Sequence, residues 1–117
     1  MKKNNSLSKN YLDRIPKAAE HILWDVEEKG IVTLSYLNKG VFNRVAQKLL
    51  KKPKKSYIHL DENGSFTWQQ IDGEKDIFTI GKAVDEHFGE AAHPLYERLV
   101  KFFQILDSYG FIVWVKK

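Results

Sequence analysis

The segment SYIHLDENGSFTWQQIDGEKDIFTI, residues 56–80, contains the signals that decide the fold. Residues 57–60 form a short apolar stretch typical of a strand. Asp61 follows at once and is suited to cap the N-terminus of a helix, which the Asp72-Gly73 pair then ends. Asp76 is suited to cap a second helix that ends at Gly89. We expect the apolar residues of these helices to face the core; they are Phe66, Trp68 and Ile71, then Ile77, Ile80, Val84 and Phe88.

A third and longer helix is predicted downstream of this segment. Pro94 suits its first helical position, and Gly110 suits the position just past its end. Its apolar residues recur at the spacing of a core-facing stripe, and we expect the third helix to bury Leu99, Phe103 and Leu106. The whole stripe is Leu95, Leu99, Phe102, Phe103 and Leu106. Residues 111–115, FIVWV, have the composition of a final strand.

Two strands are predicted upstream of the segment. Residues 21–28 alternate as in a half-buried strand, with Ile22, Trp24 and Val26 on one side. Residues 31–37 are β-branched and aromatic, and the Lys29-Gly30 turn makes the pair a hairpin. Residues 41–52 predict a short amphipathic helix. The order ββαβαααβ predicts an α+β fold in which a small antiparallel β-sheet packs on a three-helix unit, with the outline of a winged helix.

Length and composition predict one folded domain that needs no covalent cross-links. The chain has 117 residues, of which 43% are apolar, and it contains no cysteine. Disulfides and thiolate chemistry are therefore excluded, and a reducing compartment fits the composition. We expect residues 1–20 to form a flexible basic N-terminal leader with no secretion signal, residues 21–117 to form the domain, and the protein to be cytoplasmic.

The charged residues are unevenly distributed along the chain. Six basic residues and no acid lie between positions 44 and 55, whereas six acids and two lysines lie between positions 72 and 90. A basic cluster of this kind suits nucleic acid, an anionic membrane or an acidic peptide, and it is equally typical of a solvated helix end.

The sequence contains no recognisable catalytic or metal-binding pattern. The four histidines, at positions 21, 59, 87 and 93, lack the spacing of a metal-binding helix. The glycines do not form a phosphate-binding loop, and no serine sits in a nucleophile-elbow context. We therefore expect no catalytic residue, no metal and no cofactor, and we interpret the chain as a binding protein rather than an enzyme.

The ordered set of motifs resembles the PqqD-like family, the relatives of the coenzyme PQQ synthesis protein D. The set begins with the strand, Leu-Asp, the helix with Trp68 at its middle, and Ile-Asp-Gly of residues 56–80. It continues through HFGE (87–90), PLYERL (94–99) and LDSYGFI (106–112). The resemblance covers roughly residues 24–112, with gaps. It implies a winged-helix-like fold in which a three-stranded antiparallel sheet packs on three helices.

The resemblance also implies a function. Members of the family act as peptide chaperones: they are recognition elements for ribosomally made peptides that a partner enzyme, often a radical S-adenosylmethionine protein, later modifies. The leader segment of the precursor peptide is thought to add as a strand beside the third strand and against the third helix. Carried over to this sequence, the strand positions are Tyr57, Ile58, His59 and Leu60, and the helix positions are Leu95, Arg98, Leu99, Lys101 and Phe102.

Several alternatives stay open from sequence. The helix at 41–52 and the strand at 111–115 depart from the family pattern, and either could cover the proposed edge. Arg98 suits either the peptide groove or a surface ion pair with Glu97 or Asp107, and Ile58 and Leu60 are the strand pair that we expect to face inward. A winged-helix nucleic-acid-binding protein, a structural subunit that docks on an enzyme, and a homodimer formed through the strand edge are the competing interpretations.

Overall fold

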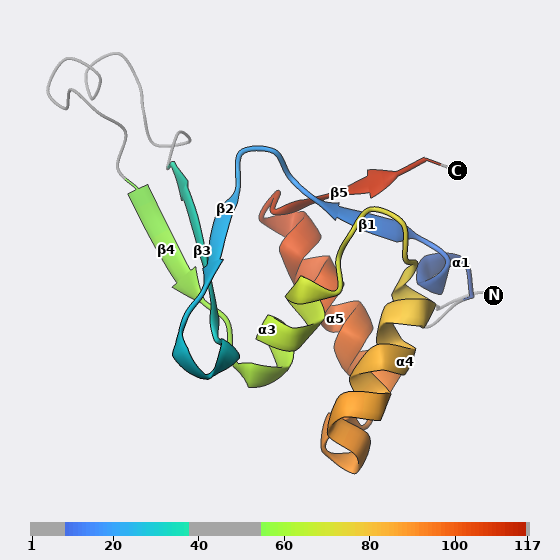
Figure 1. Cartoon of the computed structure of the whole chain (residues 1–117). Coiled ribbons are helices and arrows are strands. Elements are labelled where there is room, and N and C mark those ends of the chain that lie inside the picture. The colour runs from blue at the N-terminus through green and yellow to red at the C-terminus, as the bar shows by residue number, and fades with distance from the viewer. Residues whose placement is uncertain (1–8, 38–54, 117) are drawn as a thin grey trace, which may run out of the picture.

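The computed structural model describes residues 9–37 and 55–116 of the chain. The helices are α1 (Lys9–Leu12), α3 (Glu62–Gln69), α4 (Ile77–Phe88) and α5 (Leu95–Ser108), with short 3-10 turns η1 (Glu28–Gly30) and η3 (Gly89–Ala92). The strands are β1 (Ile15–Ala18), β2 (Leu23–Val26), β3 (Val32–Leu37), β4 (Lys55–His59) and β5 (Ile112–Val115). The α+β class and the antiparallel sheet with three helices are confirmed (Figure 1).

The larger sheet is antiparallel in the order β2-β3-β4. In its middle row, Leu34 of β3 lies opposite Trp24 of β2 and opposite Ile58 of β4. Leu34 is fully buried, and Ile58 and Leu60 pack against the same core, so the inward direction expected for these two side chains is confirmed. The alternate residues of β4, Tyr57 and His59, are exposed.

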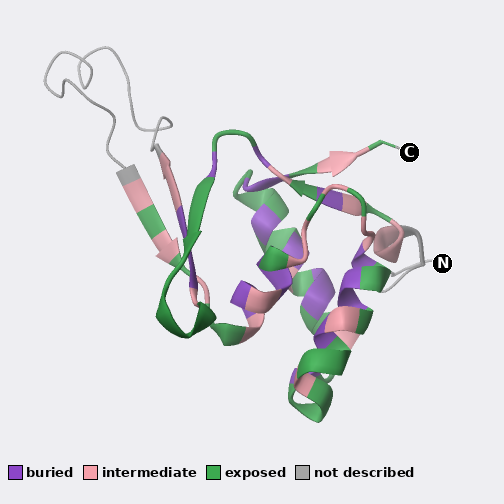
Figure 2. Ribbon diagram, viewed as in Figure 1, coloured by how far each residue is buried: buried purple, intermediate pink, exposed green. Residues whose placement is uncertain are grey.

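Helices α3, α4 and α5 share one apolar core with this sheet; α3 packs against β3, and α4 packs against α3 and α5 on the side away from the sheet (Figure 1). The largest fully buried side chains include Trp68 of α3, Ile77 and Ile80 of α4, and Phe103 of α5. Leu99 and Leu106 are also buried, so the core positions expected on the longest helix are confirmed (Figure 2).

The predicted N-caps and the end of α4 are confirmed, whereas α3 ends at Gln69, three residues before the Asp72-Gly73 pair that we expected to end it. The Asp61 side chain accepts a hydrogen bond from the Gly64 amide (2.7 Å), and that of Asp76 accepts one from the Thr79 amide (2.8 Å). Gly89 follows α4 with φ of 61°, a conformation that favours glycine. Pro94 directly precedes α5, one residue earlier than expected.

Two expectations about the N-terminal half need correction. Residues 9–18, which we assigned to a flexible leader, contain α1 and β1, and β1 pairs antiparallel with β5 from Ile15 opposite Val115 to Ala18 opposite Ile112. Burial of Pro16 in β1 and Ile112 in β5 accounts for this second sheet. The second correction concerns β2, where we expected Trp24 and Val26 to lie on a buried side of the strand. They are 45% and 42% exposed, because β2 is an edge strand. The Trp24 ring still packs edge-on against Trp68.

The predicted helix at 41–52 and the remaining leader residues 1–8 lie outside the described residues. Within the described ranges, no helix is long and apolar enough to span a membrane.

Candidate functional site

A cavity of about 260 Å³ lies between α3, the end of α4 with η3, and one face of α5. We call it the α5 groove. Its apolar lining surrounds a few polar side chains, as is common in ligand-binding pockets. The residues that line the α5 groove are Asp61, Asn63, Gly64, Thr67, Val84, Ala92, Leu95, Arg98, Leu99, Lys101, Phe102 and Ile105.

All five α5 positions carried over from the family resemblance line this groove. Leu99 is buried at its base, Leu95 and Phe102 are half-buried, and Arg98 and Lys101 are exposed at its rim. The Arg98 guanidinium donates a hydrogen bond through Nη1 to the carbonyl oxygen of Ala91 (2.9 Å). Arg98 therefore lies beside the groove, fixed to the loop before α5 rather than reaching for Glu97 or Asp107.

The α5 groove is connected to the end of β4 through Asp61 and Gly64. Asp61 follows β4 by two residues and caps α3, so the cap fixes where α3 begins relative to the strand. A Cβ atom on Gly64 would lie 3.2 Å from Cε1 of Phe102 and 3.6 Å from Cβ of Leu60. The absence of a side chain at Gly64 thus lets α5 approach the strand-to-helix junction closely.

The backbone of β4 alternates between two directions. The Leu60 amide donates to the Val32 carbonyl (2.9 Å), so Leu60 and the residues in step with it, Ile58 and Ser56, direct their backbone groups toward β3. The N–H and C=O groups of Tyr57 and His59 consequently point to the opposite side. Among the described residues β4 pairs with β3 alone, and β5, which we considered as a cover for this edge, pairs with β1 instead.

The other edge of the sheet, β2, is partly blocked by its own side chain. By the same alternation, Trp24 and Val26 direct their backbone groups away from β3. The Val26 amide, however, donates a hydrogen bond to Oδ1 of Asp25 (3.0 Å). A charged residue that occupies an outward donor is a common protection of edge strands, so β4 is the better edge for a further strand.

Sequence reasoning missed the opposite wall of the α5 groove. Gly64 and Thr67 of α3 and Ala92 of η3 line it, yet each has an ordinary structural explanation in the sequence alone. Ile105 was also missed, although it lies one helical turn after Lys101 and is 47% exposed. An apolar residue that continues the groove-facing row of a helix is the signal that could have found it.

The described residues contain no group of three or more His, Asp or Glu side chains that could hold a metal ion. His93 Nε2 and Asp85 Oδ1 form an isolated exposed pair at 2.7 Å.

In a comparison with protein families, the family described as coenzyme PQQ synthesis protein D (PqqD) matches residues 20–112. Neither the curated proteins nor the solved structures gave a significant match. The family match covers the three-stranded sheet of β2, β3 and β4, the helices α3, α4 and α5, and the first residue of β5.

Proposed function

Because this chain belongs to the PqqD family, a family of non-catalytic accessory proteins, we propose that it binds the leader segment of a precursor peptide and presents it to a modifying enzyme. One observation carries the proposal: Asp61, which lines the α5 groove, lies two residues past the end of β4, the edge strand of the described sheet.

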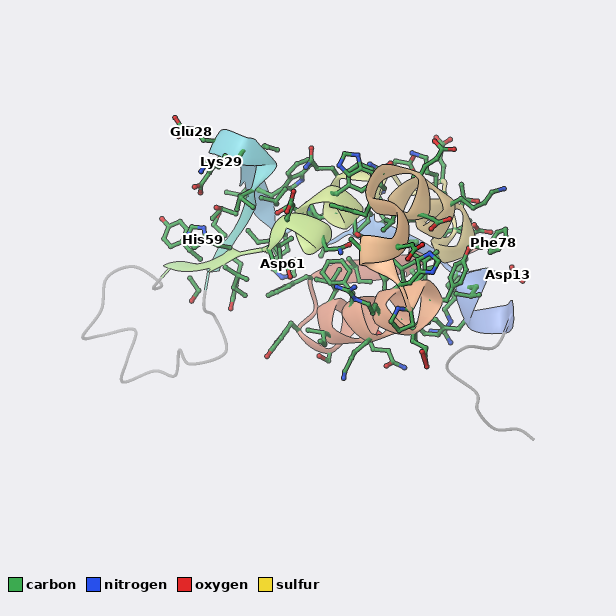
Figure 3. All side chains as sticks on the ribbon, turned by 90° about the horizontal axis from the view of Figure 1, so that it is seen from below. Asp13, Glu28, Lys29, His59, Asp61 and Phe78 are labelled. Carbon is green, nitrogen blue, oxygen red and sulfur yellow. The ribbon has the colours of Figure 1, made fainter. Side chains whose placement is uncertain are left out.

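In the proposed complex the leader adds to β4 as an extra strand. The outward N–H and C=O groups of His59 supply backbone hydrogen bonds to it, as an exposed strand edge does in other peptide-binding domains. A peptide that extends past the end of β4 then meets Asp61 and enters the α5 groove. Figure 3 shows His59 at the end of β4 and Asp61 on the connection into α3, with α5 on the opposite side of β4 from η1 in this view.

Backbone pairing is too weak to account for binding by itself. Even four backbone hydrogen bonds contribute about 2–6 kcal/mol net, whereas a micromolar dissociation constant requires about 8 kcal/mol. An extended peptide also loses conformational entropy when it is ordered. Burial of one large apolar side chain in the α5 groove contributes about 1.5–3 kcal/mol more. Apolar leader residues seated against Leu99 and Phe102 are therefore a requirement of the proposal.

The charges at the groove rim favour an acidic leader. Arg98 and Lys101 are both exposed on α5, and Asp61 is the carboxylate among the groove residues. Rim charges of this kind orient a ligand and raise its association rate more than its affinity. We infer that the modifying enzyme, for which a radical S-adenosylmethionine protein is the family-based expectation, acts on the bound precursor in the cytoplasm.

The edge can be tested with a matched pair of variants. A displayed library of random peptides is selected on the wild-type chain, and an enriched peptide is titrated into ¹⁵N-labelled protein. Changes in amide chemical shift are expected to concentrate at residues 57–61 and along α5.

His59→Pro and His59→Ala form the matched pair of variants. Both remove the imidazole, but only proline removes the outward N–H, so binding of the enriched peptide should be weaker in the proline variant. Ile58 is unsuitable for this test, because its N–H faces β3.

Shift changes confined to another surface, or equal affinity of the two folded His59 variants, would disprove strand addition to β4. A salt-sensitive gel shift with nucleic acid and no enriched peptide would favour the winged-helix alternative. Self-association that competes with the enriched peptide would identify β4 as a homodimer edge instead.

A further inference from the structure

The outer face of the sheet carries a hydrogen-bonded chain of three side chains beside the β4 edge. Thr33 of β3 and His59 of β4 are direct cross-strand partners, and Oγ1 of Thr33 lies 2.8 Å from Nδ1 of His59. The Thr33 hydroxyl also donates to Oε2 of Glu27, which lies between β2 and η1. The alternation established above makes Thr33 and His59 a non-hydrogen-bonded pair, the kind in which facing side chains come closest.

The direction of these hydrogen bonds fixes the tautomer of His59. A threonine hydroxyl has a single proton, and a carboxylate can only accept. Since Thr33 gives its proton to Glu27, it must accept from His59, so Nδ1 of His59 carries the hydrogen. In the neutral imidazole Nε2 is then unprotonated and acts as a hydrogen-bond acceptor. The His59 side chain is 64% exposed, so this acceptor is open to a neighbour on the outer face.

A strand added to β4 would place one side chain directly against His59. Residues opposite each other in an antiparallel pair lie on the same face, with Cβ atoms about 4.5–5.5 Å apart. The carboxylate of Glu27 lies behind His59, with its Oε2 atom 3.7 Å from Nδ1, and Asp25 occupies the same cross-strand row on β2. The side chains of this face nearest to an added strand are thus His59, with its acceptor nitrogen, and Tyr57, with the Glu27 carboxylate next to His59.

We propose that His59 is a specificity-determining residue that selects a hydrogen-bond donor, preferably Lys or Arg, at the leader position paired with it. The inference rests on the proposed strand addition and deepens it, because it assigns chemistry to both faces of the peptide. Apolar residues at alternate positions face the α5 groove, and a donor between them faces His59. Asp or Glu at the His59 position is disfavoured, in contrast to the acidic residues that suit Arg98 and Lys101.

Two experiments test the proposal, and the first uses the free protein. Long-range ¹H–¹⁵N correlation spectra of the ¹⁵N-labelled chain at neutral pH should show the Nδ1-protonated tautomer for His59. Thr33→Val removes the hydroxyl at nearly constant volume and should abolish that preference, whereas Ser35→Ala, on the same face of β3, should leave it unchanged. An Nε2-protonated His59 in the wild-type chain would overturn the proposal whether or not a peptide binds.

The second experiment compares peptides selected from a displayed random library by wild-type, His59→Gln and His59→Leu chains. The position paired with His59 is identified by contacts in NMR spectra of the complex. Donors should be enriched there by the wild-type chain, partly by the glutamine variant, whose side-chain oxygen can accept, and not by the leucine variant. Replacing the donor by Glu in an enriched peptide should weaken binding about two- to fivefold, the range of a cross-strand pair.

The same residue preference in the His59→Leu selection would refute the specificity role while strand addition stands. If the wild-type chain enriches no peptide that contacts β4, the proposed function itself fails, and this inference fails with it. The two failures are therefore distinguishable.

Discussion

Gly81 of α4 and Leu99 of α5 approach each other so closely that a Cβ atom on Gly81 would lie 2.8 Å from Cδ1 of Leu99. The same Cβ atom would lie 2.7 Å from Cε1 of Tyr96. Both contacts are shorter than ordinary carbon–carbon contacts, so this glycine sets the spacing of the two helices. Since Leu99 also forms the base of the α5 groove, the helix crossing determines the position of the groove wall.

We predict that Gly81→Ala destabilises the fold by about 1–3 kcal/mol, the usual cost of overpacking a core. The gain in helix propensity from Gly to Ala, about 1 kcal/mol, opposes this loss without cancelling it. Chemical denaturation of the variant and the wild-type chain measures the difference. Ala83→Gly, two residues along α4, is the control for propensity alone, and an unchanged or raised stability in Gly81→Ala would show that α4 and α5 can separate at little cost.

The adjacent phenylalanines of α5 should separate stability from binding. Phe103 is fully buried, whereas Phe102 is half-buried and lines the α5 groove. We expect Phe103→Ala to cost about 3–5 kcal/mol of unfolding free energy. Phe102→Ala should cost clearly less, because part of its ring already contacts water, but should weaken an enriched peptide by more than tenfold. Denaturation curves and calorimetric titration of both variants provide the comparison, and normal peptide binding by folded Phe102→Ala would remove this ring from the site.

The sequence predicted the three core helices, the hairpin and the caps because each depends on local signals. Asp61, Asp76 and Gly89 act within one turn of their own position, and the stripe of Leu99, Phe103 and Leu106 follows from helical periodicity alone. The pairing of β1 with β5 joins residues about a hundred positions apart, and no local pattern connects them. For the same reason one wall of the groove, on α5, was predicted while the facing residues of α3 and η3 were not.

The pKa of Asp72 gives a prediction for stability against pH. Hydrogen bonds from the Lys75 and Glu74 backbone amides, both 2.9 Å long, lower this pKa below its usual value, and the Lys75 charge acts in the same direction. A lowered folded-state pKa means that the ionised carboxylate stabilises the fold above the unfolded-state pKa, and that this contribution is lost as the pH falls through the folded-state value.

Asp72→Asn should therefore be less stable than the wild-type chain at neutral pH, by less than about 1 kcal/mol because the site is solvent-exposed. The two chains should converge as the pH falls below about 4, the ordinary range of an aspartate pKa. Urea midpoints measured across this pH range test the sign. A stability difference that stays constant with pH would mean that the amide loses packing or hydrogen bonding rather than charge.

Arg98 provides a test of the leader's charge. The residue is exposed and fixed by its hydrogen bond to the Ala91 carbonyl, so its guanidinium stands at the groove rim without a buried partner to lose. We expect Arg98→Glu to shift the melting temperature little, since single exposed charges contribute about 0–1 kcal/mol. Its affinity for an acidic peptide should fall about five- to tenfold, with most of the change in the association rate at low salt. Glu97→Arg, the opposite change at the neighbouring position outside the groove, is the matched control. Its association rate should stay near that of the wild-type chain. A rise in the Glu97→Arg rate as large as the fall in the Arg98→Glu rate would show that the overall charge of α5, and not its groove rim, attracts the peptide.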